Sequence, residues 1–144
     1  MKIEIKEGHN ALEVIIKCQT ATEEISKIKN LLNSHAKKIS CTKDGSTHLV
    51  DAREILYFES VDKVPFLYTE TDVYELSLKL YELEEMLSYM GFIRSAKSQI
   101  INTYKIESLR PDFGGRLEVT MQGGERLIVS RQYAKILKER LGLR

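Results

Sequence analysis

The sequence predicts a mainly β fold with a few short helices. Apolar and polar side chains alternate in short runs, as in residues 2–6 and 73–78, which is typical of half-buried strands. Glycine-containing turn signals separate several of these runs, at Asp44-Gly45, Gly114-Gly115 and Gly123-Gly124. The intervals between them are too short for the crossovers that parallel strands need, so we expect small antiparallel sheets.

Residues 1–38 are predicted to form a β-β-α unit. Residues 2–6 and 12–17 read as two strands around the turn residues 8–10. Thr20 and Glu23 fit a capping box, and the helix that follows should end near Ala36. We expect this unit either to join two copies of the chain or to cover a sheet edge of the remainder.

Residues 39–144 are predicted to form a second domain, built mostly of strands. A helix whose apolar face begins at Leu80 should stop at Gly91, and Ser130 should cap a final helix. The apolar stripe of that last helix is expected to comprise Tyr133, Ile136, Leu137 and Leu141. The expected strands are residues 39–42, 47–50, 55–60, 66–69, 73–78, 98–101, 106–111, 116–121 and 125–129. No two predicted helices are joined by a short turn, so a helix-turn-helix is not expected.

Composition bounds the class of protein. The chain has 144 residues, of which 42% are hydrophobic and 30% charged, so a disordered chain is not expected. No apolar run is long enough to span a bilayer, and no segment resembles a signal peptide. The two cysteines, Cys18 and Cys41, are too few for a disulfide framework, so we expect a cytoplasmic protein in which both thiols are buried and inert.

Residue patterns for catalysis or metal binding are missing from the sequence. The histidines His9, His35 and His48 lie far apart, and neither cysteine has a C-x-x-C partner. There is no phosphate-binding glycine loop of the P-loop type and no pairing of nucleophile and base. We therefore predict a protein that is not an enzyme and that needs no metal or other cofactor.

Charge is distributed unevenly along the chain. Residues 91–144 carry 11 basic against 5 acidic side chains, whereas residues 46–90 carry 3 against 10. A basic segment of this kind favours a polyanionic partner, although chance segregation on a solvated surface explains it equally well.

Four motifs resemble the LytTR family of bacterial DNA-binding domains, in the family's order and over residues 39–144. They are the strand Ile55-Leu56-Tyr57-Phe58-Glu59-Ser60, the segment from Phe92 to Asn102, the strand Ile106-Glu107-Ser108-Leu109, and the terminal element Val129-Ser130-Arg131-Gln132-Tyr133 preceded by Gly124-Glu125. The resemblance implies small antiparallel sheets with little helix, and a bacterial transcription regulator. Since only residues 1–38 precede the matching region, we expect a stand-alone regulator without a receiver domain.

The resemblance also implies which residues bind double-stranded DNA. In the family, loops between strands reach successive grooves. The matching positions here are Lys63 in the first loop, then Arg94, Lys97 and Ser98, and finally Arg131 and Gln132 at the start of the last helix. Lys97 stands where the family often has His or Asn, which favours a phosphate contact over base readout.

Other interpretations of these residues stay open at this stage. Arg131 could pair with Glu125, Lys63 with Glu59 or Asp62, and Lys97 could be a solvated strand residue. For the whole chain we expect sequence-specific binding of DNA as a homodimer on repeated half-sites, with no membrane contact. The alternative is a protein-interaction or ligand-sensing module that does not bind DNA.

Overall fold

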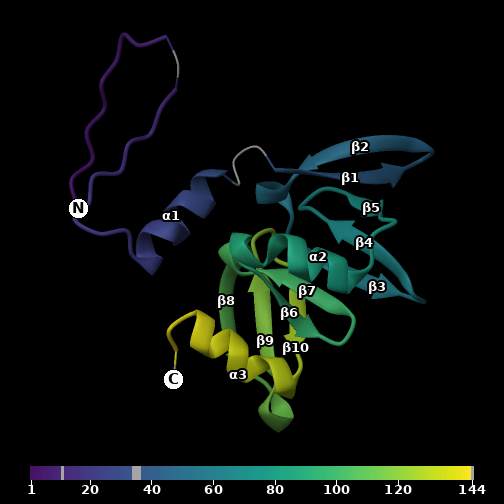
Figure 1. Cartoon of the computed structure of the whole chain (residues 1–144). Helices are drawn as coiled ribbons and strands as arrows, with labels where there is room; N and C mark the ends of the chain where they lie inside the picture. Colours follow the sequence, from purple (N-terminus) through teal and green to yellow (C-terminus); the bar gives the residue numbers. More distant parts are fainter. Residues whose placement is uncertain (11, 34–36, 144) are drawn as a thin grey trace.

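Two antiparallel sheets and three α-helices make up the computed structural model, which describes residues 1–10, 12–33 and 37–143 (Figure 1). The larger sheet has the strand order β2-β1-β5-β4-β3-β7-β6, and the smaller one β10-β9-β8. The mainly β, antiparallel architecture is as predicted. The elements are α1 (Glu23–Asn33), β1 (Lys38–Lys43), β2 (Ser46–Asp51), β3 (Tyr57–Val61), β4 (Val64–Tyr68), β5 (Val73–Glu75), α2 (Leu80–Leu87), β6 (Phe92–Ala96), β7 (Gln99–Asn102), β8 (Ile106–Pro111), β9 (Leu117–Met121), β10 (Arg126–Val129) and α3 (Arg131–Arg140).

The large sheet is buried on both faces where β3, β7 and β6 run side by side. On one face Phe58, Phe92 and Ile100 pack with Leu83 and Leu87 of α2. On the other face their neighbours in the strands pack against the small sheet and α3, in a cluster that includes Tyr57, Ile93, Ile101, Val119, Val129 and Leu137. Because successive strand residues point to opposite faces, the same three strands supply both cores.

Hairpin turns follow the sequence signals closely. Asp44 and Gly45 both have positive φ and join β1 to β2, as predicted. The loop expected at residues 61–65 is shorter, since only Asp62 and Lys63 separate β3 from β4.

Strand β6 was not predicted. A bulge between Arg94 and Ala96 breaks its alternation, which removes the pattern that identifies a strand.

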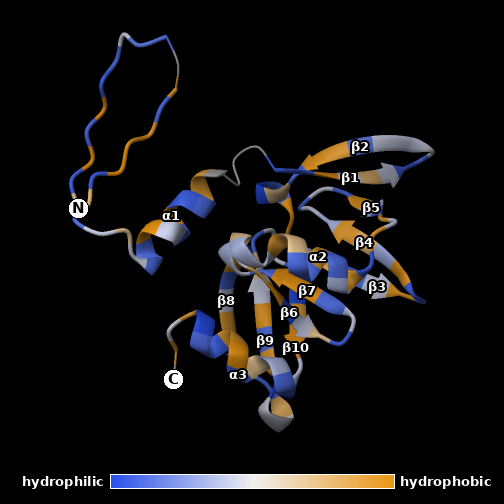
Figure 2. Cartoon of the chain, in the orientation of Figure 1, coloured by the Kyte–Doolittle hydropathy of each residue, from blue (hydrophilic) through white to orange (hydrophobic). Residues whose placement is uncertain are grey.

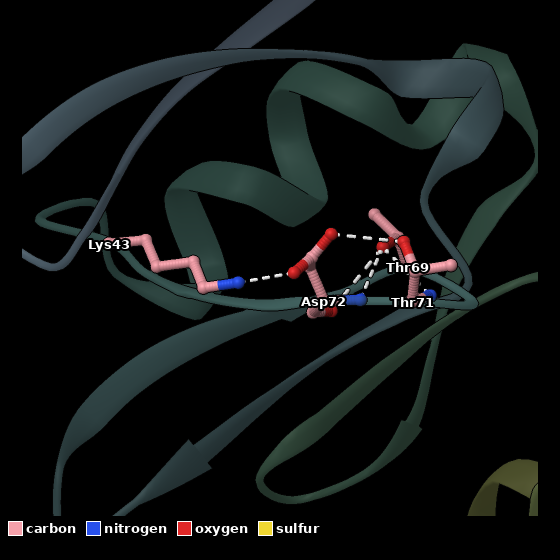
Figure 3. A network of polar contacts seen from close by, with 4 residues as sticks. All are labelled: Lys43, Thr69, Thr71 and Asp72. Atoms are coloured by element: carbon pink, nitrogen blue, oxygen red, sulfur yellow. Dashed lines mark hydrogen bonds and ion pairs between the residues drawn. The ribbon is translucent and has the colours of Figure 1, made fainter.

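A polar network ties the β1–β2 hairpin to the rest of the large sheet (Figure 3). Strand β1 meets β5 at one register pair, Thr42 with Glu75. Beside it, the ammonium of Lys43 pairs with the carboxylate of Asp72, and this hydrogen bond lowers the pKa of Asp72. The Asp72 carboxylate also accepts a hydrogen bond from Thr71 Oγ1 (3.0 Å), and the Asp72 amide donates to Thr69 Oγ1 (3.0 Å).

The N-terminal hairpin is not formed. Residues 1–10 and 12–22 contain no strand, and their side chains are exposed, so the predicted β-β-α unit is wrong in its strands. Figure 2 shows this segment alternating between hydrophilic and hydrophobic residues away from the two sheets. An isolated two-stranded hairpin is marginal in water unless its apolar face is covered, and no core within the described residues covers this one.

Helix α1 begins at Glu23, later than a Thr20 cap implies, and the predicted end near Ala36 lies outside the described residues. Its residues Ile25 and Ile28 are half-buried, and the helix contacts the 3-10 turn Ser88–Met90 that follows α2.

Two expectations about individual side chains are also wrong. Ile136 is exposed, because α3 packs through Ala134 and Leu137 instead. Cys18 is exposed, since it lies in the N-terminal segment, whereas Cys41 faces the core, where burial raises the pKa of its thiol.

Gly91 provides a test of the packing behind the sheet. It ends the turn after α2 with φ +85°, and a Cβ added there would press into the ring of Tyr104. We expect Gly91→Ala to lower the free energy of unfolding by about 2 kcal/mol or more, because it adds a clash to the cost of the left-handed backbone. Urea denaturation measures the loss.

Gly45→Ala is the matched control for this experiment. Gly45 has a similar φ of +78°, but no atom lies within 4 Å of an added Cβ. It should therefore show the backbone cost alone. Equal losses for the two variants would mean that the Tyr104 contact contributes nothing to stability.

Candidate functional site

Two backbone hydrogen bonds bring the three predicted regions together. The amide of Ser60, at the end of β3, donates to the carbonyl of Ser98 in the β6–β7 turn (2.8 Å). The amide of Ser130, just before α3, donates to the carbonyl of Ser95 in β6 (3.0 Å). The β3–β4 turn, the β6–β7 turn and the start of α3 therefore form a row along one edge of the molecule (Figure 1).

The β3–β4 turn presents Lys63 on a strained backbone. Asp62 and Lys63 have φ of 50° and 67°, and Val61 pairs with Val64 across the turn. Positive φ at both central residues is the geometry of a two-residue type I′ hairpin, which costs about 1–2 kcal/mol per non-glycine residue. Lys63 is exposed and makes no ion pair with Glu59, Asp62 or any other described residue.

Arg94 faces inward and holds the β6–β7 turn. Its Nε donates to Glu84 Oε2 on α2 (3.0 Å), and its Nη1 donates to the carbonyl of Lys97 (2.6 Å). The Arg94 side chain is only 17% exposed. The side chains of Lys97 and Ser98, by contrast, are exposed at the tip of the same turn, and within the described residues Lys97 has no ion pair.

A buried polar chain lies beneath these turns. Ser95 Oγ donates to Gln99 Oε1 (2.9 Å), and Gln99 Nε2 donates to Glu59 Oε2 (3.3 Å). Ser95 and Gln99 are buried, so leaving either without its partner would carry the full desolvation cost of a polar group. We did not predict this chain. Ser95 and Gln99 lie among other polar residues, Arg94, Lys97 and Ser98, so no sequence pattern singled them out.

Arg131 projects from the first turn of α3. Ser130 occupies the N-cap position with an extended backbone, as predicted, although its side chain makes no capping bond. Arg131 and Gln132 are both exposed, and Arg131 forms no ion pair with any residue that the structure describes. A guanidinium at a helix N-terminus opposes the helix dipole, so an anionic ligand would relieve an unfavourable arrangement.

Glu125 forms no ion pair with Arg131 and instead accepts a hydrogen bond from the phenol of Tyr57 (2.6 Å). Tyr57 is buried and stacks on Tyr68 with ring centroids 4.3 Å apart. Burial, reinforced by the bond to Glu125, raises the pKa of Tyr57 far above that of a free tyrosine. This contact fixes the β9–β10 turn against β3.

Groups suited to other chemistry do not gather in the described part of the chain. There, no three His, Cys, Asp or Glu side chains lie close enough together to hold a metal ion. None of the helices described is long and apolar enough to cross a membrane.

Comparison with known proteins identifies the domain. The model of the LytTr DNA-binding domain matches residues 45–142. The chain belongs to the LytTR family. Two relatives from Staphylococcus aureus, strains NCTC 8325 and COL, are named as HTH-type transcriptional regulators. Each is 33% identical over 100 residues, which cover 69% of this chain and 67% of the relative.

A solved LytTR structure has the same fold. The LytTr DNA-binding domain of a Bacillus cereus protein superposes with a TM-score of 0.70 at 27% identity, covering 74% of this chain and 97% of that one. LytTR is a family of DNA-binding domains and not of enzymes. In this chain strands separate α1, α2 and α3, so among the described residues no two α-helices form a helix-turn-helix pair.

The contacts of Arg94 yield a testable prediction. The guanidinium of Arg94 is hydrogen-bonded to Glu84 and to the carbonyl of Lys97, so its loss should disorder the β6–β7 turn. We therefore expect Arg94→Ala to weaken DNA binding about fivefold, which corresponds to about 1 kcal/mol. The slope of log K against log salt should stay unchanged, since no phosphate contact is lost. Titrations of a fluorescent duplex at several salt concentrations measure both quantities.

Glu84→Gln is the companion variant, because it weakens the interaction of Glu84 with Arg94 without removing a cation. It should also lower the affinity for DNA, but by less than Arg94→Ala does. A salt slope that falls by about 1 in Arg94→Ala would instead show that Arg94 itself touches phosphate, as the family resemblance implies.

Proposed function

We propose that this chain is a sequence-specific regulator of transcription that binds double-stranded DNA through the β3–β4 turn, the β6–β7 turn and the start of α3. The observation that carries the proposal is the pair of backbone hydrogen bonds, Ser60 to Ser98 and Ser130 to Ser95, that hold these three regions in one row. Each region offers one exposed cation without an ion pair among the described residues: Lys63, Lys97 and Arg131. The names of the staphylococcal relatives support the regulatory role.

The three cations suit different parts of the duplex. Arg131 has a planar guanidinium that can donate two hydrogen bonds to the O6 and N7 edge of a guanine. Lys97 and Lys63 carry compact ammonium groups on flexible stems, which suit phosphate oxygens. Ser98 and Gln132, exposed beside these residues, supply neutral hydrogen-bonding groups. Arg94 acts by holding the second turn.

Selection from a random duplex pool, followed by binding at several salt concentrations, tests the function as a whole. A specific DNA-binding domain should enrich a defined sequence, and its affinity should fall linearly in log–log terms as salt rises. Failure to bind any duplex at about 50 mM salt would instead favour a protein-interaction module.

Replacement of Arg131 tests base readout. Arg131→Ala should cost about 1–3 kcal/mol on the selected site and flatten the preference at one base pair, because a bidentate contact is lost. Affinities on the selected and a scrambled duplex measure this. Equal weakening on both duplexes would contradict a base-reading role, and a sharply lower melting temperature would make the residue structural.

Replacement of Lys97 tests the phosphate contact. Lys97→Ala should weaken binding to the selected and scrambled duplexes alike and reduce the salt slope by about 1. Lys138→Ala on α3, away from the row of turns, serves as a charge-matched control and should change neither quantity. Loss of affinity on the selected duplex alone would assign Lys97 to a base instead.

The N-terminal segment is the proposed dimer contact, which would let two copies occupy repeated half-sites about one helical turn apart. Ile3, Ile5 and Val14 are exposed, although their pattern is that of a half-buried strand. Two copies of residues 3–7, paired antiparallel about Ile5, would set Glu4 of each copy opposite Lys6 of the other. Such opposite charges favour the pairing.

A full-length chain with Ile3, Ile5, Val14 and Ile16 changed to Ser should be a monomer by light scattering if this contact is correct. The wild type should be a dimer. Since the four side chains are exposed, the melting temperature at low concentration should not fall. Changing Leu49 and Val73, which are also exposed, to Ser is the control for lost surface hydrophobicity. An unchanged dimer would contradict the proposal.

A further inference from the structure

Phe113 is the most exposed aromatic side chain in the described part of the chain. It is 86% exposed, against 59% for Tyr104 and 58% for Tyr81. Unlike a tyrosine it has no polar tip to interact with water, so full exposure is unfavourable and neither packing nor hydrogen bonding accounts for it.

The loop that carries Phe113 is well defined. It joins β8 to β9 and is closed by the amide of Asp112, which donates to the carbonyl of Arg116 (2.9 Å). Arg116 in turn donates from Nε to the carbonyl of Phe113 (3.0 Å) and forms an ion pair with Asp112 (3.4 Å). These contacts hold the loop in a conformation that presents the ring to solvent.

The same loop touches Arg131. Gly115 has φ +81°, and a Cβ added to it would lie 3.1 Å from Cγ of Arg131. The stem of Arg131 therefore lies over the backbone of this loop, and only a glycine leaves room for it without adjustment. In Figure 1 the green β8–β9 loop lies beside α3 at the bottom of the molecule and continues the row of turns.

We propose that the β8–β9 loop is a fourth DNA-binding element, in which Phe113 contacts the methyl group of a thymine next to the base read by Arg131. The inference rests on the proposed function, because it takes Arg131 to enter the major groove. The thymine methyl is the one apolar group that base edges expose there, and a phenyl ring is a suitable partner for it. Contact with it would remove the exposed ring from water at the moment of binding.

The experiment uses the full-length chain and the duplex selected by the wild type. Phe113→Ala should weaken binding about threefold to tenfold on this duplex, a modest loss suited to one apolar base contact. Each thymine of the duplex is then replaced in turn by uracil, which removes only the methyl group. One replacement should weaken the wild type and leave Phe113→Ala unaffected.

Tyr81→Ala is the matched control, because it removes a half-exposed aromatic ring from α2, away from the loop. It should bind like the wild type. Melting temperatures of both variants should equal that of the wild type, since neither ring belongs to a core cluster.

Each outcome decides a separate point. If Phe113→Ala binds normally while Arg131→Ala does not, the fourth element is wrong and the proposed function stands. If Phe113→Ala binds weakly but no uracil replacement matters, the ring does not contact a thymine methyl, and that assignment is overturned. If the wild type enriches no sequence and binds no duplex, the proposed function is wrong, and so is this inference, which rests on it.

Discussion

The double burial of β3, β7 and β6 is the constraint on which the rest of the structure depends. Phe58 and Ile100 face the core under α2, while their chain neighbours Tyr57 and Ile101 face the core under the small sheet and α3. Because side chains alternate with a period of two, a slip of one residue in any of these strands would exchange the two cores. Their register is therefore fixed from both sides at once.

A fixed register determines where the candidate site lies. Pairing of Glu59 with Gln99 sets Ser60 opposite Ser98, so the β3–β4 and β6–β7 turns emerge at the same end of the sheet. The bulge in β6 then turns the carbonyl of Ser95 toward the residue that precedes α3. The turns that bind DNA in this proposal are thus placed by the hydrophobic core.

The sequence predicted those features that depend on neighbouring residues. Asp44-Gly45 identified its hairpin, and the strand at residues 106–111 has the predicted limits, because turn chemistry and alternation are local. Features that depend on distant partners were missed or wrong. Strand β6 loses its pattern at the bulge, and the N-terminal hairpin has the right alternation but no core to cover it. The family motif indicated the three regions of the candidate site. The hydrogen bond from Arg94 to Glu84 joins β6 to α2, and no local sequence pattern predicts such a contact.

The proposed binding of DNA by turns, without a recognition helix, requires that the turns keep their shape before DNA binds. A flexible loop would lose conformational freedom on binding, and each ordered side chain or loop residue would subtract from the affinity. Here the chain from Ser95 through Gln99 to Glu59 lies beneath the turns, and a buried polar group tolerates few arrangements because an unmade hydrogen bond is costly. In the proposed binding mode, the two sheets and α3 therefore fix the shape of the turns, and a few exposed side chains at the turn tips contact the DNA. It follows that exchanging Arg131 should redirect base preference within the same fold, whereas exchanging Gln99 should disturb the contacts of both the β3–β4 and the β6–β7 turn.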